Sequence, residues 1–140
     1  MSFEITTKIE APTATVWDVL VDVATWPEWT RSMERVTRLE SGTFTIGSQA
    51  RIKQPRLRPM TWTVTELTPH ASFTWEARSP GLVLRAGHVL QPLGAKVTEV
   101  RLVIEQRGVA AWLAQPFTSQ LARRYVAMEA NGLKARAEAM

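Results

Sequence analysis

Apolar and polar residues alternate along most of the chain, which is the pattern of strands with one buried face. At the start, Phe3, Ile5 and Ile9 alternate with Glu4 and Lys8. The same period of two recurs in six further segments, at about residues 33–41, 48–54, 60–68, 71–78, 82–91 and 97–106. Because turn-forming residues separate these segments, the pattern predicts seven strands joined as hairpins in an antiparallel sheet.

Helical spacing replaces the alternation directly after the first strand. Val16, Trp17 and Leu20 recur at this spacing behind Pro12, a residue that suits the first turn of a helix. Asp22 falls where this helix should end, and it is a candidate cap for a second short helix. Two short helices are therefore expected between the first and second strands.

The second short helix carries two tryptophans, Trp26 and Trp29, in the stretch DVATWPEWTRS at residues 22–32. Tryptophan has a large apolar surface that is usually buried in a folded protein. A short segment with two such side chains is best explained as a wedge. We expect it to close one end of the sheet.

A long helix is predicted from about residue 109 to residue 139, where the alternation of the strands stops. Its apolar stripe has spacings of four, four, four and three and consists of Leu113, Phe117, Leu121, Tyr125 and Met128. Roughly 30 residues at 1.5 Å each give a helix of about 45 Å. Pro116 is expected to kink this helix or to start its main part.

The order of these elements predicts an α+β fold. An antiparallel sheet with one apolar face must cover that face. One helix covers a flat sheet poorly. A curved sheet can wrap around the helix, and this arrangement leaves space between sheet and helix. We therefore expect a seven-stranded curved antiparallel sheet around a long C-terminal helix, in a single domain over residues 1–140.

Composition narrows the classes of protein. No run of about 18 apolar residues is present, so no membrane span is expected, and the start of the chain lacks the pattern of a signal peptide. Cysteine is absent, which removes disulfides and thiolate chemistry. We expect a cytoplasmic location. The net charge of +4 is dispersed, and no basic run is interleaved with aromatic residues, so nucleic-acid binding is not expected.

Two polar residues on predicted inward faces are candidates for catalysis. His88 shares its parity with Leu84 and Leu90, so its imidazole is placed to act as an acid or a base near neutral pH. The alternative is a core histidine bonded to a neighbouring group, and a bulge at Gly87 would reverse the parity. Tyr125 lies on the inward stripe of the long helix. Its hydroxyl either donates a hydrogen bond to a ligand carbonyl or bonds to backbone in the core.

The remaining inward residues form candidate ligand-binding walls. Those on the strands and the long helix are Trp62, Phe73, Trp75, Leu84, Phe117, Leu121 and Met128. Aromatic walls suit flat apolar ligands, and they suit plain core packing equally well. Glu66 continues the parity of Trp62 and Val64, which is a reason to consider it for the rim of a cavity.

Several kinds of chemistry lack their signature residues. Two histidines 18 positions apart without any cysteine give no metal-ligand spacing, and no G-x-S-x-G elbow or phosphate-binding glycine loop is present. No cofactor and no metal are therefore expected. The densest basic cluster consists of Arg51, Lys53, Arg56 and Arg58. These residues either form a solvated strand face or attract an anionic ligand or an acidic partner.

The stretch APTATVWDVLVDVATWPEWT at residues 11–30 resembles the early signature of the START-like helix-grip superfamily, in its polyketide cyclase/dehydrase-like (SRPBCC) branch. The matching residues are Pro12, Val16, Trp17, Asp18, Asp22, Trp26, Pro27 and Trp29. Two later stretches, MTWTVTELTPHASFTW and GHVLQPLGAKVTEVRL, resemble the central and late hairpins of the family, although Ala95 and Lys96 replace a common Gly-Thr pair. The resemblance covers residues 2–137. It implies a helix-grip fold whose cavity holds a lipid, sterol, polyketide or other apolar molecule.

Three functions stay open at this stage. The first is a binding protein for a small apolar or aromatic molecule such as a lipid or polyketide. The second is a polyketide cyclase or dehydrase in which His88 and Tyr125 polarise a carbonyl or move a proton. The third is a protein-interaction or chaperone-like domain whose cavity is filled by tryptophan. The oligomeric state is not fixed by the sequence, although an edge strand offers a route to a homodimer.

Overall fold

The computed structural model describes the chain from residue 2 to residue 140, and side chains at residues 2–109 and 120–140. The chain begins with β1 (Ser2–Ile9), α1 (Thr13–Val21) and the 3-10 helix η1 (Val23–Glu28). Six strands follow, namely β2 (Arg35–Arg38), β3 (Gln49–Lys53), β4 (Met60–Thr68), β5 (Ser72–Ser79), β6 (Leu82–Gly94) and β7 (Val97–Arg107). The chain ends in α2 (Val109–Glu138). This order confirms the predicted α+β fold.

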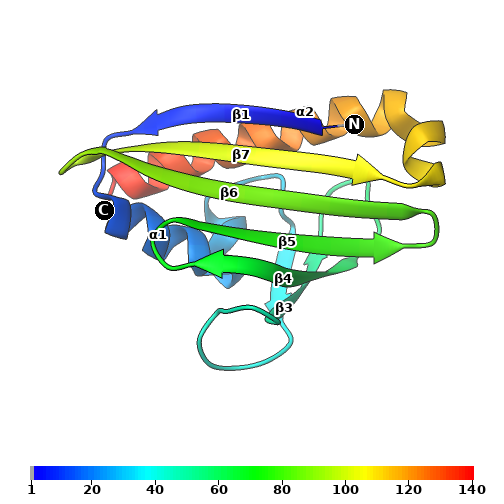
Figure 1. The fold of residues 1–140 in the computed structure, drawn as a ribbon, viewed down its shortest axis with the longest axis horizontal. Helices are drawn as coiled ribbons and strands as arrows, with labels where there is room; N and C mark the ends of the chain where they lie inside the picture. The colour runs from blue at the N-terminus through cyan, green and yellow to red at the C-terminus, as the bar shows by residue number, and fades with distance from the viewer. Residues whose placement is uncertain (1) are drawn as a thin grey trace.

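The seven strands form one antiparallel sheet in the order β1-β7-β6-β5-β4-β3-β2. The first strand therefore pairs with the last, and β1 and β2 are the two edges. Helix α2 runs along one face of the sheet near β1 and β7, and its C-terminal end lies near α1 (Figure 1). The described residues contain no helix that combines the length and the apolar character needed to cross a membrane.

A β-bulge in β4 corrects one expectation about the inner face. The register between β4 and β5 shifts between Val64 and Glu66, so the parity reverses after Val64. Glu66 is consequently not at a cavity rim but on the outer face, where it forms a salt bridge of 3.2 Å with Arg85. The register through Gly87 is continuous, and the bulge considered there does not form.

The two tryptophans of the second short helix lie as the wedge hypothesis predicts. Trp26 is 1% exposed, and its ring lies 5.4 Å from that of Trp75 and 5.5 Å from that of Trp29. The Trp26 indole Nε1 donates a hydrogen bond of 2.9 Å to the carbonyl of Leu20, which joins η1 to the end of α1. Asp22 precedes η1 as expected, but its side chain makes no capping hydrogen bond.

Helix α2 approaches η1 very closely at one glycine. A Cβ atom placed on Gly132 would lie 2.0 Å from the carbonyl oxygen of Trp29, a separation that real side chains do not adopt. Only a residue without a side chain therefore allows the backbone of α2 to pack directly on that of Trp29. This contact fixes the C-terminal half of α2 beside the wedge.

Candidate functional site

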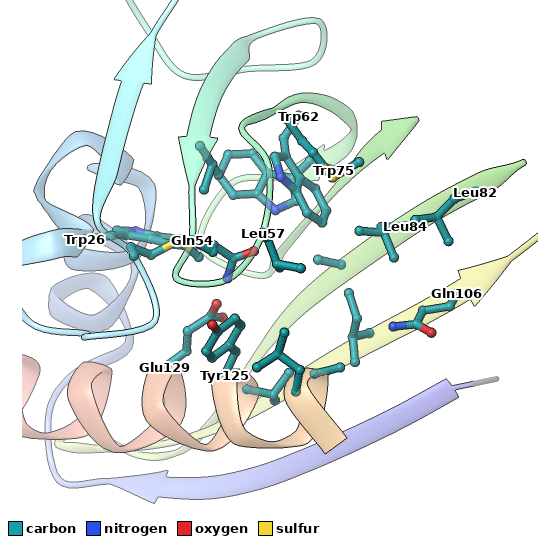
Figure 2. Close-up of a pocket in the computed structure, with 18 residues that line it drawn as sticks. Trp26, Gln54, Leu57, Trp62, Trp75, Leu82, Leu84, Gln106, Tyr125 and Glu129 are labelled. Carbon is teal, nitrogen blue, oxygen red and sulfur yellow. The ribbon is translucent and has the colours of Figure 1, made fainter. Parts of the chain in front are cut away.

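A cavity of about 130 Å³ lies between the inner face of the sheet and α2. Figure 2 shows its wall, to which β4 to β7, the loop between β3 and β4, and α2 contribute. The described residues that line it are Trp26, Met33, Ile52, Gln54, Leu57, Met60, Trp62, Trp75, Leu82, Leu84, Ala86, Ile104, Gln106, Leu121, Ala122, Tyr125, Val126 and Glu129. Apolar side chains predominate, and the lining set contains no lysine, arginine or histidine.

Aromatic rings form the wall at the end near η1. Trp62 on β4 and Trp75 on β5 point to the same face, and their ring centroids are 5.7 Å apart. Trp26 packs on the other side of Trp75. These tilted arrangements are ones that aromatic pairs favour, and they hold the rings in fixed positions. The result is a wall of tilted aromatic rings at one end of the cavity.

Helix α2 supplies the polar groups of the opposite wall. Tyr125 and Glu129 are four residues apart, so they lie one above the other on the same helix face. Both side chains rise from α2 toward Gln54, which belongs to the loop between β3 and β4 (Figure 2). The cavity thus has an apolar sheet side and a polar spot on its helix side.

Glu129 is a lining residue whose carboxyl pKa is strongly raised in the folded protein. It makes no hydrogen bond and no ion pair in the described part of the chain, and it is half-buried among the residues that line the cavity. Burial raises the pKa of the Glu129 carboxyl from 4.5 to about 8. The unfolded chain ionises this group at lower pH than the folded protein does. Its contribution to stability is therefore full below pH 4.5 and is lost as the pH rises toward 8.

The hydroxyl of Tyr125 closes the site against the β3–β4 loop. It donates a short hydrogen bond to the carbonyl oxygen of Pro55. Burial raises the pKa of Tyr125, and the nearby charges of Arg56 and Arg124 oppose this rise. Because its proton is directed to Pro55, Tyr125 presents an acceptor oxygen to the cavity. The sequence allows the Tyr125 hydroxyl to donate either to a ligand or to the backbone. In the structure it donates to the backbone.

The β3–β4 loop is held in place by one residue of the predicted basic cluster. The Lys53 Nζ atom donates hydrogen bonds of 2.7 Å to the carbonyls of Gln54 and Leu57. It also lies 3.5 Å from a carboxylate oxygen of Glu34. Gln54 and Leu57 line the cavity, so this loop forms part of its wall. Lys53 therefore organises the loop rather than standing free on a strand face.

His88 lies in the core beside the cavity and is not among the lining residues. Its side chain is 3% exposed, and its Nδ1 lies 3.1 Å from the carbonyl oxygen of Phe73. Since a carbonyl only accepts, Nδ1 carries the proton. The imidazole stacks on the Phe73 ring at 4.1 Å and 14°. Burial lowers the pKa of His88 to about 4, and the Phe73 carbonyl opposes this only partly.

Acid is expected to destabilise the protein through His88. In the unfolded chain this imidazole titrates near its ordinary pKa of 6.5, whereas the folded protein keeps it neutral down to about 4. The unfolded state therefore gains protons at His88 as the pH falls through 6.5, and this contribution lowers the free energy of unfolding by about 2 kcal/mol between pH 7.5 and pH 5, while Glu129 acts in the opposite direction. Urea unfolding at both pH values, in variants that differ at His88, isolates the His88 contribution.

The control uses the second histidine, His70, which is exposed in the turn between β4 and β5. From pH 7.5 to pH 5, the change in the free energy of unfolding should be about 2 kcal/mol less favourable for His70→Gln than for His88→Gln. Glu129 contributes an opposite slope, but it is present in both variants and cancels in their difference. An equal pH dependence in the two variants contradicts the buried, neutral His88.

The predicted site residues divide into three groups. Trp62, Trp75, Leu84, Leu121 and Tyr125 come together around the cavity. The side chains of Phe73 and His88 are instead packed on each other, and Met128 is outside the set of α2 residues that line the cavity. The side chain of Phe117 and the effect of Pro116 on the helix lie outside the described residues. Parity identifies the inner face, but it does not separate residues around the cavity from those in the solid core.

Sequence reasoning missed Glu129, Gln54 and Gln106. Glu129 had a usable signal, because it is four residues after Tyr125 and continues the inward stripe of α2. A charged residue on an apolar helix face is unusual enough to mark a site. Gln54 had no such signal, since it belongs to a loop whose path depends on the bonds of Lys53 and Tyr125.

Comparison by sequence identifies the family. The chain matches the family described as "Polyketide cyclase / dehydrase and lipid transport" over residues 1–138. The protein therefore belongs to this family, which confirms the predicted resemblance. None of the curated proteins compared with the chain by sequence is a match.

Solved structures show the same fold at low sequence identity. An aromatase/cyclase from a Streptomyces species has a TM-score of 0.80 and 22% identity, with 99% of this chain and 93% of that chain covered. A START superfamily protein from Mycobacterium smegmatis has a TM-score of 0.79 and 16% identity, with 99% and 97% covered. A protein from Thermus thermophilus has a TM-score of 0.79 and 15% identity, with 99% and 98% covered. At these identities the likeness concerns the fold.

Proposed function

We propose that this protein binds a small apolar or aromatic molecule in the cavity between the sheet and α2. The observation that carries this proposal is the combination of a largely apolar lining with a small polar spot at Tyr125 and Glu129. Sites for small molecules have this composition, because apolar walls supply affinity and a few polar groups fix orientation. The family description, which includes polyketide cyclases and lipid transport, is in line with such a ligand.

The cavity volume limits the size of the ligand. About 130 Å³ is similar to an engineered cavity of about 150 Å³ that takes up benzene, and it is roughly ten times what one water molecule needs. A compound of one or two rings fits this space. The indole faces of Trp62 and Trp75 favour an aromatic ring over a flexible chain, because a rigid ring loses little freedom on stacking.

A cyclase or dehydrase is the alternative function. It was first considered because His88 and Tyr125 both lie on inward faces. Neither offers a proton to the cavity in this geometry, since His88 is not a lining residue and Tyr125 donates to Pro55. The two residues on which the cyclase hypothesis rests are thus not placed for it, and binding without turnover is our first choice. The third function, a domain filled by tryptophan, is less favoured because Trp26, Trp62 and Trp75 stand around the cavity and leave space between them and α2.

Filling the cavity should abolish binding without unfolding the protein. Ala86 lies on the inner face of β6 and lines the cavity. Phenylalanine at this position would occupy space that a ligand ring needs. We expect Ala86→Phe to weaken binding of the neutral two-ring probe ethylnaphthalene at least about tenfold, which corresponds to about 1.4 kcal/mol. A fluorescence titration measures the dissociation constant.

The matched control is Ala95→Phe, which adds the same ring in the exposed turn between β6 and β7. It should bind the probe like the original protein. Circular dichroism and thermal unfolding verify that both variants are folded. Undiminished binding by folded Ala86→Phe would mean that the probe occupies another place.

A further inference from the structure

The Glu129 carboxyl is an unpartnered polar group that lines a largely apolar cavity. In the described part of the chain no donor reaches it, and the described lining residues include no cation. A carboxylate withdrawn from water without a partner is unfavourable, so this carboxyl stays protonated near neutral pH. A protonated carboxyl has one O–H donor. The cavity therefore contains a donor that lacks an internal acceptor.

Two of the other polar groups of the wall, those of Tyr125 and Gln106, do not duplicate this donor. Tyr125 directs its proton to the Pro55 carbonyl and offers only lone pairs. Gln106 lies on β7 among the residues at the far end of the cavity, away from Tyr125 and Glu129 (Figure 2). Gln54 faces Glu129 from the β3–β4 loop, and its amide can donate as well as accept (Figure 2). An acceptor atom that enters beside Tyr125 would thus meet two donors, the O–H of Glu129 on α2 and the amide of Gln54 on the loop.

The charges around this spot disfavour a cationic ligand. Arg56 on the loop and Arg124 on α2 both act on Tyr125, and Glu34 acts on it in the opposite sense. Lys53 is occupied by loop carbonyls and by Glu34, and His88 is outside the lining. Two positive charges against one negative charge raise the cost of bringing an amine into the site. A neutral acceptor meets no such penalty.

We propose that Glu129 binds the polar end of the ligand as an uncharged hydrogen-bond donor, and that this end carries a neutral acceptor oxygen such as an aryl ketone or quinone carbonyl. This inference rests on the proposed function, because it requires a ligand in the cavity. It names the chemical class of that ligand as a small aromatic carbonyl compound. It also assigns to Glu129 the carbonyl contact that sequence analysis gave to His88 and Tyr125.

The test compares three naphthalene probes of similar shape. Methyl naphthyl ketone carries an acceptor oxygen, ethylnaphthalene carries none, and naphthylmethylamine carries a cation. Quenching of tryptophan fluorescence gives the dissociation constants at pH 6.5 and pH 9.5 for the original protein and for three variants. Glu129→Gln retains a neutral donor at both pH values, and Glu129→Leu removes it. Glu99→Gln changes a carboxyl on the outer face of β7 and serves as the control.

We expect the ketone to bind about tenfold more tightly than ethylnaphthalene at pH 6.5, as a hydrogen bond to an otherwise unsatisfied buried group allows. This preference should fall several-fold at pH 9.5, where Glu129 ionises and loses its proton. Glu129→Gln should keep the preference at both pH values, Glu129→Leu should lose it, and Glu99→Gln should behave like the original protein. Binding of ethylnaphthalene by Glu129→Leu shows that the cavity of this variant is intact.

Two results would overturn the inference while leaving the proposed function in place. One is a ketone preference that survives in Glu129→Leu. The other is tightest binding of the amine, lost in Glu129→Gln, because that outcome makes Glu129 an anionic anchor. If neither the ketone nor ethylnaphthalene binds to the original protein or to any variant, the proposed function fails and the inference fails with it.

Discussion

Replacing Trp26 with alanine is expected to lower the free energy of unfolding by about 4 kcal/mol, in the range found for tryptophan removed from a core. Trp26 is 1% exposed and packs against the rings of Trp75, Trp29 and His88, the last at 5.7 Å. Its removal would also break the hydrogen bond from the indole to Leu20. The end of the cavity would lose its wall as well. Chemical denaturation monitored by circular dichroism measures the change.

A more conservative replacement separates packing from the hydrogen bond. Trp26→Phe keeps an aromatic ring between η1 and β5 but cannot donate to Leu20. We expect it to lose about half as much stability as Trp26→Ala. A loss below 1 kcal/mol for Trp26→Ala would contradict the role of this residue as the wedge that closes the sheet.

Gly132→Val is expected to be the second most damaging substitution, with a loss of about 3 kcal/mol or more. Any Cβ atom at this position would collide with the Trp29 carbonyl, and a branched side chain adds further contacts. Because the obstacle is backbone rather than a flexible side chain, α2 or η1 must shift to make room. Either shift would disturb the face of α2 that carries Glu129. Thermal unfolding measures the loss.

Helix propensity provides the internal control for this position. Alanine is favoured over glycine within a helix by about 1 kcal/mol, so Gly132→Ala would stabilise α2 if the contact with Trp29 were unimportant. We expect Gly132→Ala to destabilise the protein, whereas Asn131→Ala, at an exposed neighbouring position, should be neutral or slightly stabilising. Stabilisation by Gly132→Ala would show that the two backbones are not in contact.

The fold was largely predictable because strands and helices have distinct periods. The alternation around Trp62 and Trp75 identified the inner face of the sheet, and the stripe through Leu121 and Tyr125 identified the inner face of α2. The prediction for Glu66 was wrong, because a single extra residue in β4 reverses every face that follows it. The sequence of β4 contains no residue that predicts this bulge. Gly87 predicted a bulge in β6 instead, where none forms.

The site was predictable only in part, because a cavity is a property of three-dimensional packing. Phe73 and Trp75 have the same parity on one strand, yet only Trp75 is among the described lining residues. His88 was the obvious candidate for chemistry by residue type, and its bond to the Phe73 carbonyl makes it a core residue. Residue type alone does not identify Glu129, because a carboxyl in water has a pKa of about 4.5 and is ionised at neutral pH. Burial in the folded protein raises the pKa of this carboxyl to about 8, and the sequence alone does not show that burial.

The account depends most on the claim that an apolar molecule occupies the space between the sheet and α2. Isotope-filtered nuclear Overhauser spectroscopy of the labelled protein with methyl naphthyl ketone tests this claim directly. We predict contacts from the ring protons of the probe to the methyl groups of Leu84, Leu121 and Val126, which line the cavity from both sides. Contacts confined to exposed side chains such as Leu39, Ile46 or Leu93 would contradict it.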